Sequence, residues 1–211
     1  MTMQLPAEAL QRARALLARG GRRLLGLAGP PGAGKSTVAA LLLAELGDQA
    51  QIVPMDGFHL AQAELERLGR AGRKGAPDTF DAAGFVSLLQ RLRTPVPGET
   101  VYAPEFRREI EEPIAGALAV PPELPLLIVE GNYLLLENGA WAGVRPLLDE
   151  CWHVAVDQDQ RLAQLIARHQ RHGRSAEDAR AWALGNDEPN ARLVEAAAGR
   201  ADWQLRWPLA A

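Results

Sequence analysis

The sequence predicts a three-layer α/β/α fold, in which a mainly parallel sheet lies between two layers of helices. Short apolar runs alternate along the chain with longer segments of helical periodicity. The runs at 24–28, 126–129 and 152–156 have the composition of strands that are buried on both faces. The first run leads into a glycine-rich turn and then a helix, an arrangement that is common at the ligand-binding edge of parallel sheets.

The chain begins with a segment that should form an amphipathic helix over 6–19, because its apolar residues recur on one face. Gly20-Gly21 would end this helix. We expect 1–21 to pack on the outside of a single domain spanning 1–211, since no linker or repeat interrupts the chain.

The turn after the first strand fits the phosphate-binding pattern G-x-x-x-x-G-K-[ST] and precedes a helix over 37–46. Glycines allow backbone N–H groups to surround phosphate oxygens, and the helix N-terminus adds positive potential. Lys35 would reach the β- and γ-phosphates, and the Ser36 hydroxyl would bind Mg²⁺. The fold class therefore narrows to a P-loop NTPase fold. The expected nucleotide-binding residues here are Gly29, Pro30, Pro31, Gly32, Ala33, Gly34, Lys35, Ser36 and Thr37.

A second polar cluster, Asp56-Gly57-Phe58-His59, follows a short strand over 51–55. Ligands of parallel α/β sheets bind at the carboxyl ends of strands, so this cluster is a candidate for the acceptor side of a site. A helix over 60–68 follows. The loop 69–79 is rich in basic residues and glycine, so we expect it to be exposed and mobile. It can be read equally well as a solvated loop or as part of the site.

A helix is expected over 81–93, with Asp81 as its N-cap. The proline-rich segment 94–106 is expected to be extended, and the charge run 107–112 to be a solvated surface. The apolar strand after it ends in Glu130-Gly131, the form of a Walker B strand. Glu130 would hold Mg²⁺ through water or orient the reacting hydroxyl.

The last third of the chain should supply an arginine-bearing lid. A helix is expected within 141–150, a strand over 152–156, and an Asp157-capped helix over 158–172. Arg161 and Arg168 lie one heptad apart, and Arg171 and Arg174 flank Gly173. Arginine's planar fork suits phosphate, although a solvated basic face has the same pattern.

Beyond the lid, the pattern predicts a helix from Ser175 through Trp182, a break at 185–190, a helix over 191–198 and a strand over 203–207.

Composition limits the partners and the compartment. The formal net charge of −3 argues against a general nucleic-acid-binding surface. The single cysteine excludes an intrachain disulfide and suits a reducing compartment. The N-terminal segment lacks the apolar core of a signal peptide, and no apolar run approaches a membrane span. We therefore expect a cytoplasmic protein that binds neither nucleic acid nor membrane. A homodimer is compatible with the sequence.

The ordered motifs resemble the P-loop kinases that include uridine kinase, phosphoribulokinase and bacterial pantothenate kinase. Within this group the chain is most similar to the branch labelled fructose transport system kinase or nucleoside/nucleotide kinase-like. The resemblance covers about 24–194 and rests on matching stretches in the same order. They are Gly29–Ser36, Met55–His59, Lys74–Asp81, Glu112–Gly116, Val129–Leu134 and Gly185–Ala191.

The resemblance implies catalytic roles. Asp56 matches the acid that acts as base toward the acceptor hydroxyl, and Glu130 matches the Mg²⁺-associated acid. With Lys35 and the lid arginine Arg168 they form the expected catalytic set. Arg168, Arg174 and Asn190 are further candidates for binding the nucleotide. The candidates for binding the acceptor are Asp56, His59, Lys74, Asp78, Tyr102, Arg107, Arg108 and Asn132.

One residue departs from this branch. Its members commonly read P-x-F-D-R where this chain has Pro104-Glu105-Phe106-Arg107-Arg108. Arginine in place of an acid would suit an acceptor that already bears a phosphate or a carboxylate.

We therefore expect ATP- and Mg²⁺-dependent phosphoryl transfer to a hydroxyl of a small metabolite such as a sugar, a nucleoside or a pantothenate-like acid. A kinase of a phosphorylated acceptor, of the nucleotide or dephospho-coenzyme type, is the first alternative. A nucleotide-dependent regulatory ATPase is the second, although no N-K-x-D element for reading guanine is present. A nucleotide-binding protein without activity is disfavoured, because the lysine, serine and both acids are intact.

Overall fold

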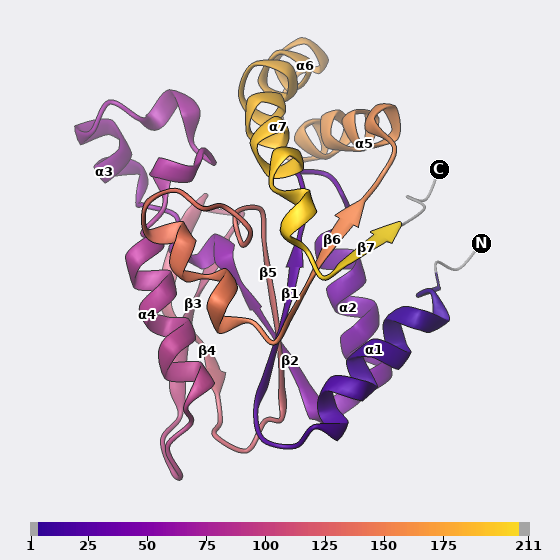
Figure 1. Ribbon diagram of the computed structural model, residues 1–211. Coiled ribbons are helices and arrows are strands. Elements are labelled where there is room, and N and C mark those ends of the chain that lie inside the picture. The colour runs from indigo at the N-terminus through magenta and orange to yellow at the C-terminus, as the bar shows by residue number, and fades with distance from the viewer. Residues whose placement is uncertain (1–3, 207–211) are drawn as a thin grey trace.

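A five-stranded parallel sheet forms the centre of the computed structural model, which describes residues 4–206 (Figure 1). The strands are β1 Arg23–Ala28, β2 Ala50–Pro54, β3 Val101–Arg107, β4 Glu112–Val120, β5 Leu126–Gly131, β6 Glu150–Ala155 and β7 Trp203–Arg206. The helices are α1 Ala7–Ala18, α2 Lys35–Leu46, α3 Gln62–Arg67, α4 Ala82–Arg93, α5 Gln158–Arg171, α6 Ala176–Trp182 and α7 Glu188–Ala196. The sheet order is β2-β5-β1-β6-β7.

Helices cover both faces of the sheet, which confirms the predicted three layers (Figure 1). On one face α1 and α2 bury Leu16 and Leu42 against Leu25 of β1. On the other face α4 buries Phe85 against Val129 of β5. The central strands β1 and β5 therefore point apolar side chains to both faces, which explains their apolar runs. The helices α5 to α7 stand beyond the carboxyl ends of β1 and β6, where ligands bind.

An antiparallel hairpin of β3 and β4 lies beside the sheet, and its second strand was not predicted. The sequence of β4 lacks an alternating apolar pattern because most of its side chains are exposed. The first strand packs on the turn Met55–Phe58, where a Cβ atom at Gly57 would lie 2.3 Å from the carbonyl oxygen of Pro104. Glycine at position 57 therefore permits the hairpin to approach the polar cluster that follows β2.

Two predictions about local structure are wrong. The segment 141–150 forms 3₁₀ turns at Gly139–Gly143 and Arg145–Leu147 rather than an α-helix. The expected break at 185–190 is a π-helical turn, Ala183–Asp187, which joins α6 to α7. Pro189 lies in the first turn of α7, where no backbone N–H partner is required.

The predicted helix caps and the last predicted strand can be compared with the structure. The Asp81 and Asp157 caps are confirmed, because each side chain accepts backbone N–H hydrogen bonds. The terminal strand is confirmed as β7, and Trp207 lies outside the described residues. Among residues 4–206 no helix combines the length and apolar character needed to cross a membrane.

Candidate active site

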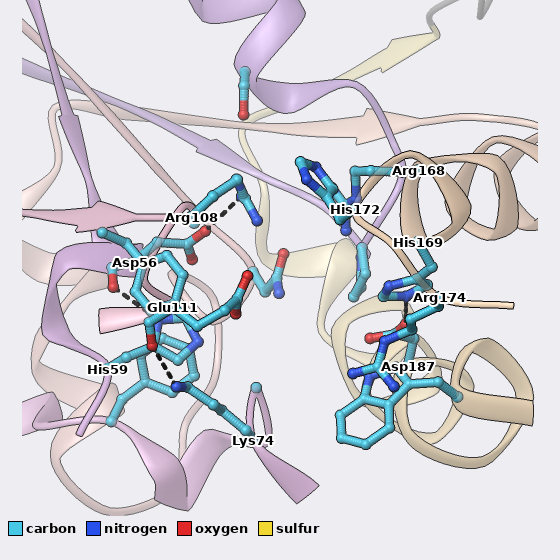
Figure 2. A pocket seen from close by; sticks show the side chains of 18 of the residues that line it. Asp56, His59, Lys74, Arg108, Glu111, Arg168, His169, His172, Arg174 and Asp187 are labelled. Carbon is cyan, nitrogen blue, oxygen red and sulfur yellow. Dashed lines mark hydrogen bonds and ion pairs between the residues drawn. The ribbon is translucent and has the colours of Figure 1, made fainter. Parts of the chain in front are cut away.

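A cavity of about 560 Å³ lies at the carboxyl edge of the sheet. Its floor includes Lys35, Ser36, Glu130 and Asn132. Figure 2 shows two walls of polar side chains that face one another across it. One wall presents Asp56, His59, Lys74, Arg108 and Glu111, and Phe106 packs against His59. The opposite wall, from the segment that runs from α5 to the π turn, presents Arg168, His169, His172, Arg174 and Asp187, and Trp182 packs against Arg174.

The P-loop bounds the floor and turns directly into α2. Gly34 has φ of 84°, a left-handed conformation that favours glycine, and Lys35 is the first residue of the helix. The Lys35 ammonium donates to the carbonyls of Gly29 at 2.9 Å and Pro30 at 3.1 Å. It also donates to Oδ1 of Asn132 at 2.7 Å. Burial lowers the pKa of Lys35 to about 8, although nearby carboxylates favour its charge.

Ser36 and Glu130 offer hard oxygen ligands side by side. The Ser36 hydroxyl donates to both Glu130 carboxylate oxygens, at 2.8 and 3.1 Å. Burial raises the pKa of Glu130, a cost that a bound cation would offset. Within 4–206 no cluster of three or more His, Cys, Asp or Glu residues forms a metal centre. The pair nevertheless fits Mg²⁺, which takes one or two protein oxygens together with phosphate and water oxygens.

Asp56 stands on the wall nearest the hairpin, in the 3₁₀ turn after β2. Its side chain is partly exposed, and its Oδ2 lies 3.5 Å from the Arg108 guanidinium. This distance is at the limit of a hydrogen bond, so the ion pair is loose. Asp56 therefore presents a carboxylate to the same cavity that Lys35 and Ser36 reach.

His59 lies next to Asp56 and is held in one orientation. Its ring lies between those of Phe80 and Phe106, with centroid distances of 4.0 and 4.6 Å. Its Nδ1 lies 2.7 Å from the carbonyl oxygen of Asp56, which can only accept, so Nδ1 carries a proton. Burial lowers the pKa of His59, which favours the neutral ring. In that tautomer Nε2 is a hydrogen-bond acceptor, suited to a hydroxyl group.

The loop 69–79, which was expected to be exposed and mobile, makes several contacts with the rest of the chain. The Arg73 guanidinium pairs with the Asp78 carboxylate, and the buried Tyr133 hydroxyl donates to the carbonyl of Gly75. The Trp141 indole donates to the carbonyl of Pro77 at 3.1 Å. These contacts fix the backbone on both sides of Lys74.

The helix α5 carries one arginine that lines the cavity and another that is buried away from it. Arg168 lines the cavity, and burial lowers the pKa of its guanidinium, with a smaller contribution from Arg108. Arg161 on the same helix is buried instead. Its guanidinium pairs with Glu188 of α7 and donates to the carbonyl of Pro31 in the P-loop at 3.2 Å. The shared face of α5 therefore serves both packing and the cavity.

Of the predicted residues in 29–37, only Pro31, Lys35 and Ser36 line the cavity, and four predicted site residues elsewhere in the chain also lie outside its lining. Asp78 is paired with Arg73, and Tyr102 on β3 is 58% exposed. Arg107 bonds to Glu105 at 2.8 Å on the outer side of the hairpin, whereas Arg108 lines the cavity. Asn190 is buried and donates to the carbonyl of Asn186 one helical turn earlier. These side chains hold the structure together or face solvent.

The structure also adds lining residues that sequence reasoning missed. His169 pairs with Asp187 at 2.7 Å. Trp182 lies against Arg174, which was predicted, with the Arg174 guanidinium carbon 4.2 Å from the ring centroid. Asp187 belongs to the Gly185–Ala191 motif, so this motif could have indicated it. Nothing in the local pattern around Glu111 or Trp182 distinguishes them from surface residues.

The comparisons with known proteins agree with this fold. No family model matches the chain. A Schizosaccharomyces pombe protein described as a putative uridine kinase is 37% identical over 199 residues, which cover 89% of this chain and 84% of that protein. An ATP-dependent kinase-like protein of Aspergillus versicolor is 38% identical over 125 residues, which cover 56% of this chain and 73% of the relative.

Among solved structures, the chain is similar to one described as a putative fructose transport system kinase from Silicibacter sp. TM1040. The identity is 40% and the TM-score 0.83, and the match covers 94% of this chain and 98% of that one.

The fold and the site define a P-loop kinase. The sequence relationship identifies the family, because the Schizosaccharomyces relative matches over most of both chains. The chain belongs to the P-loop kinases that include uridine kinase and pantothenate kinase, as the resemblance predicted.

Proposed function

We propose that this kinase transfers the γ-phosphoryl group of ATP to a hydroxyl group of a small metabolite, with Asp56 as the base. One observation carries the proposal. Asp56 lines the same cavity as Lys35, Ser36 and Glu130, so a base for the acceptor and a cradle for the donor share one space. The name of the Aspergillus relative supports ATP as the donor.

The donor side follows from the P-loop. Backbone N–H groups of the loop and the N-terminus of α2 would bind phosphate oxygens, and Lys35 would exchange its loop carbonyls for the β- and γ-phosphates. Arg168 would approach the migrating group from the lid side. Ser36 and Glu130 would hold Mg²⁺, which when bound neutralises charge on the phosphate oxygens.

The acceptor side follows from Asp56. Its carboxylate would accept the proton of the acceptor hydroxyl while that oxygen forms a bond to the γ-phosphorus. The bond from the γ-phosphorus to the bridging oxygen breaks, and that oxygen leaves with ADP. His59 would accept a hydrogen bond from a second hydroxyl through Nε2 and so orient the acceptor.

A coupled assay of ADP release tests this proposal on sugars, nucleosides, pantothenate-like acids and their phosphates. Asp56→Asn should lower acceptor-dependent release about 10²–10⁴-fold and leave ATP affinity within about two-fold. Asp48→Asn, an exposed aspartate outside the cavity, is the matched control and should behave as the wild type. Wild-type turnover in Asp56→Asn would refute the role of Asp56. ADP release that never depends on an acceptor would indicate a regulatory ATPase.

A further inference from the structure

Two cations on the acceptor wall lack a close carboxylate partner among the described residues (Figure 2). The Lys74 ammonium donates to the Glu111 carbonyl at 2.6 Å and approaches the Gln62 carboxamide oxygen at 3.4 Å, both of which are neutral groups. The Arg108 guanidinium reaches a carboxylate only at the 3.5 Å contact with Asp56. Exposed lysines and arginines are common, but these two line the same cavity as the candidate base.

Lys74 is part of a built wall. Its own carbonyl accepts a hydrogen bond from the Asn186 side chain of the lid at 2.9 Å. The next residue, Gly75, donates to the Thr79 hydroxyl at 2.9 Å and accepts from the Tyr133 hydroxyl. The backbone at Lys74 is therefore tied to the lid and to the segment after β5, so its ammonium is held where a ligand would meet it.

The turn of the hairpin brings Arg108 to the same place. Glu111 in this turn has φ of 54°, an uncommon conformation for a residue other than glycine. Its carbonyl accepts from Lys74, so the contact fastens the Lys74 loop to the turn that carries Arg108. The positive charges of Lys74 and Arg108 both contribute to the lowered pKa of His59, because each lies near the His59 ring and disfavours its protonated form.

From this arrangement we infer that the acceptor carries an anionic group, a carboxylate or a phosphate monoester, bound between Lys74 and Arg108. The inference rests on the proposed function, since it assigns the substrate class of the same site. The anion would take Arg108 away from Asp56, which would free the carboxylate for the acceptor hydroxyl. Glu111 lines the same space and could accept hydrogen bonds from further hydroxyl groups.

The contact between Arg108 and Asp56 favours an anionic acceptor over a neutral one. The Arg108 guanidinium lies 3.5 Å from the Asp56 carboxylate. An acceptor without a negative group would leave Arg108 beside the base, while an anionic acceptor supplies the guanidinium with a better partner.

Binding is tested calorimetrically on the full chain, with the P-loop saturated by Mg²⁺ and a non-hydrolysable ATP analogue. Two matched series serve as probes: glycerol, glycerate and glycerol 3-phosphate, and ribose, ribonate and ribose 5-phosphate. At least one anionic member should bind at least ~10-fold more tightly than its neutral parent. Tighter binding of glycerate or ribonate would indicate an acceptor with a carboxylate, and tighter binding of glycerol 3-phosphate or ribose 5-phosphate would indicate an acceptor with a phosphate.

Substitutions then locate the binding. Lys74→Met and Arg108→Met should each weaken anion binding at least ~10-fold, while Arg108→Lys should weaken it less. ATP-analogue affinity and the melting temperature of each variant report on correct folding. Arg67→Ala, an exposed arginine paired with Glu64 outside the cavity, is the charge control. The inference is overturned if no anionic probe binds, or if binding survives both methionine substitutions.

The two proposals can fail separately. Acceptor-dependent ADP release with neutral acceptors alone would refute the anionic acceptor and leave the kinase mechanism standing. Anion binding that depends on Lys74 and Arg108, without any acceptor-dependent ADP release, would retain the anion site and refute the mechanism.

Discussion

The ammonium of Lys35 lies 2.7 Å from the side-chain oxygen of Asn132, which joins the P-loop to the segment that follows β5. Asn132 comes directly after the strand end that supplies Glu130. The Val129–Leu134 motif therefore provides a candidate metal ligand and, two residues later, a neutral partner for the lysine. A neutral partner can hold Lys35 without competing strongly with phosphate.

Replacing this partner by a charged one should weaken ATP binding. Asn132→Asp would give Lys35 a charge-assisted hydrogen bond, about twice as strong as a neutral one, and would repel the triphosphate. We expect at least ~10-fold weaker ATP binding in Asn132→Asp and a smaller loss in Asn132→Ala, measured by calorimetry. Asn138→Asp, at an exposed position, is the control. Equal affinities in wild type and Asn132→Asp would show that Lys35 does not depend on Asn132.

The lowered pKa of Lys35 predicts proton uptake when ATP binds. Above pH 8 the lysine of the free protein loses its proton, whereas bound phosphates favour the protonated form and raise its pKa. Affinity should therefore fall as the pH rises above about 8, with uptake of up to about one proton near pH 9 and almost none near pH 7. Calorimetry in buffers of different ionisation enthalpy measures this uptake. Lys35→Arg, which stays charged, should show none.

The buried pair of Arg161 and Glu188 should be important for stability. Glu188→Ala would leave the Arg161 guanidinium, 4% exposed, without its carboxylate. A broken buried pair typically costs about 3–5 kcal/mol, which urea denaturation would detect. ATP affinity should fall as well, because Arg161 also holds the Pro31 carbonyl. Arg192→Ala removes an exposed arginine 3.7 Å from the same glutamate and should change little. Equal stabilities of Glu188→Ala and Arg192→Ala would contradict this assignment.

Local patterns account for the parts of the site that were predictable. The phosphate loop, Asp56 and Glu130 each follow a buried strand, and parallel strands bring their carboxyl ends to one edge. Sequence order and strand direction were therefore sufficient to place these groups in one cavity. The roles assigned to them remain predictions until the experiments above are done.

Contacts between residues far apart in the sequence determine which arginines line the cavity, and these contacts could not be predicted from local patterns. Arg161 and Arg168 share a helix face, yet only the contact with Glu188 and Pro31 determines that Arg161 is buried. Adjacent residues of a strand point to opposite sides, so Phe106 lines the cavity and Arg107 does not, and the turn that follows β3 brings Arg108 to the cavity. That orientation depends on β4, which has no clear strand pattern in the sequence.

The close contact between Gly57 and Pro104 limits how a new acceptor specificity could be engineered into this protein. The strand β3 rests on the backbone of the turn that carries Asp56, so exchanging the whole hairpin for another would also move the candidate base. The connecting turn 108–111 contains Arg108 and Glu111 but lies beyond that contact. Sequence libraries confined to this turn could vary the acceptor while Asp56 stays in place.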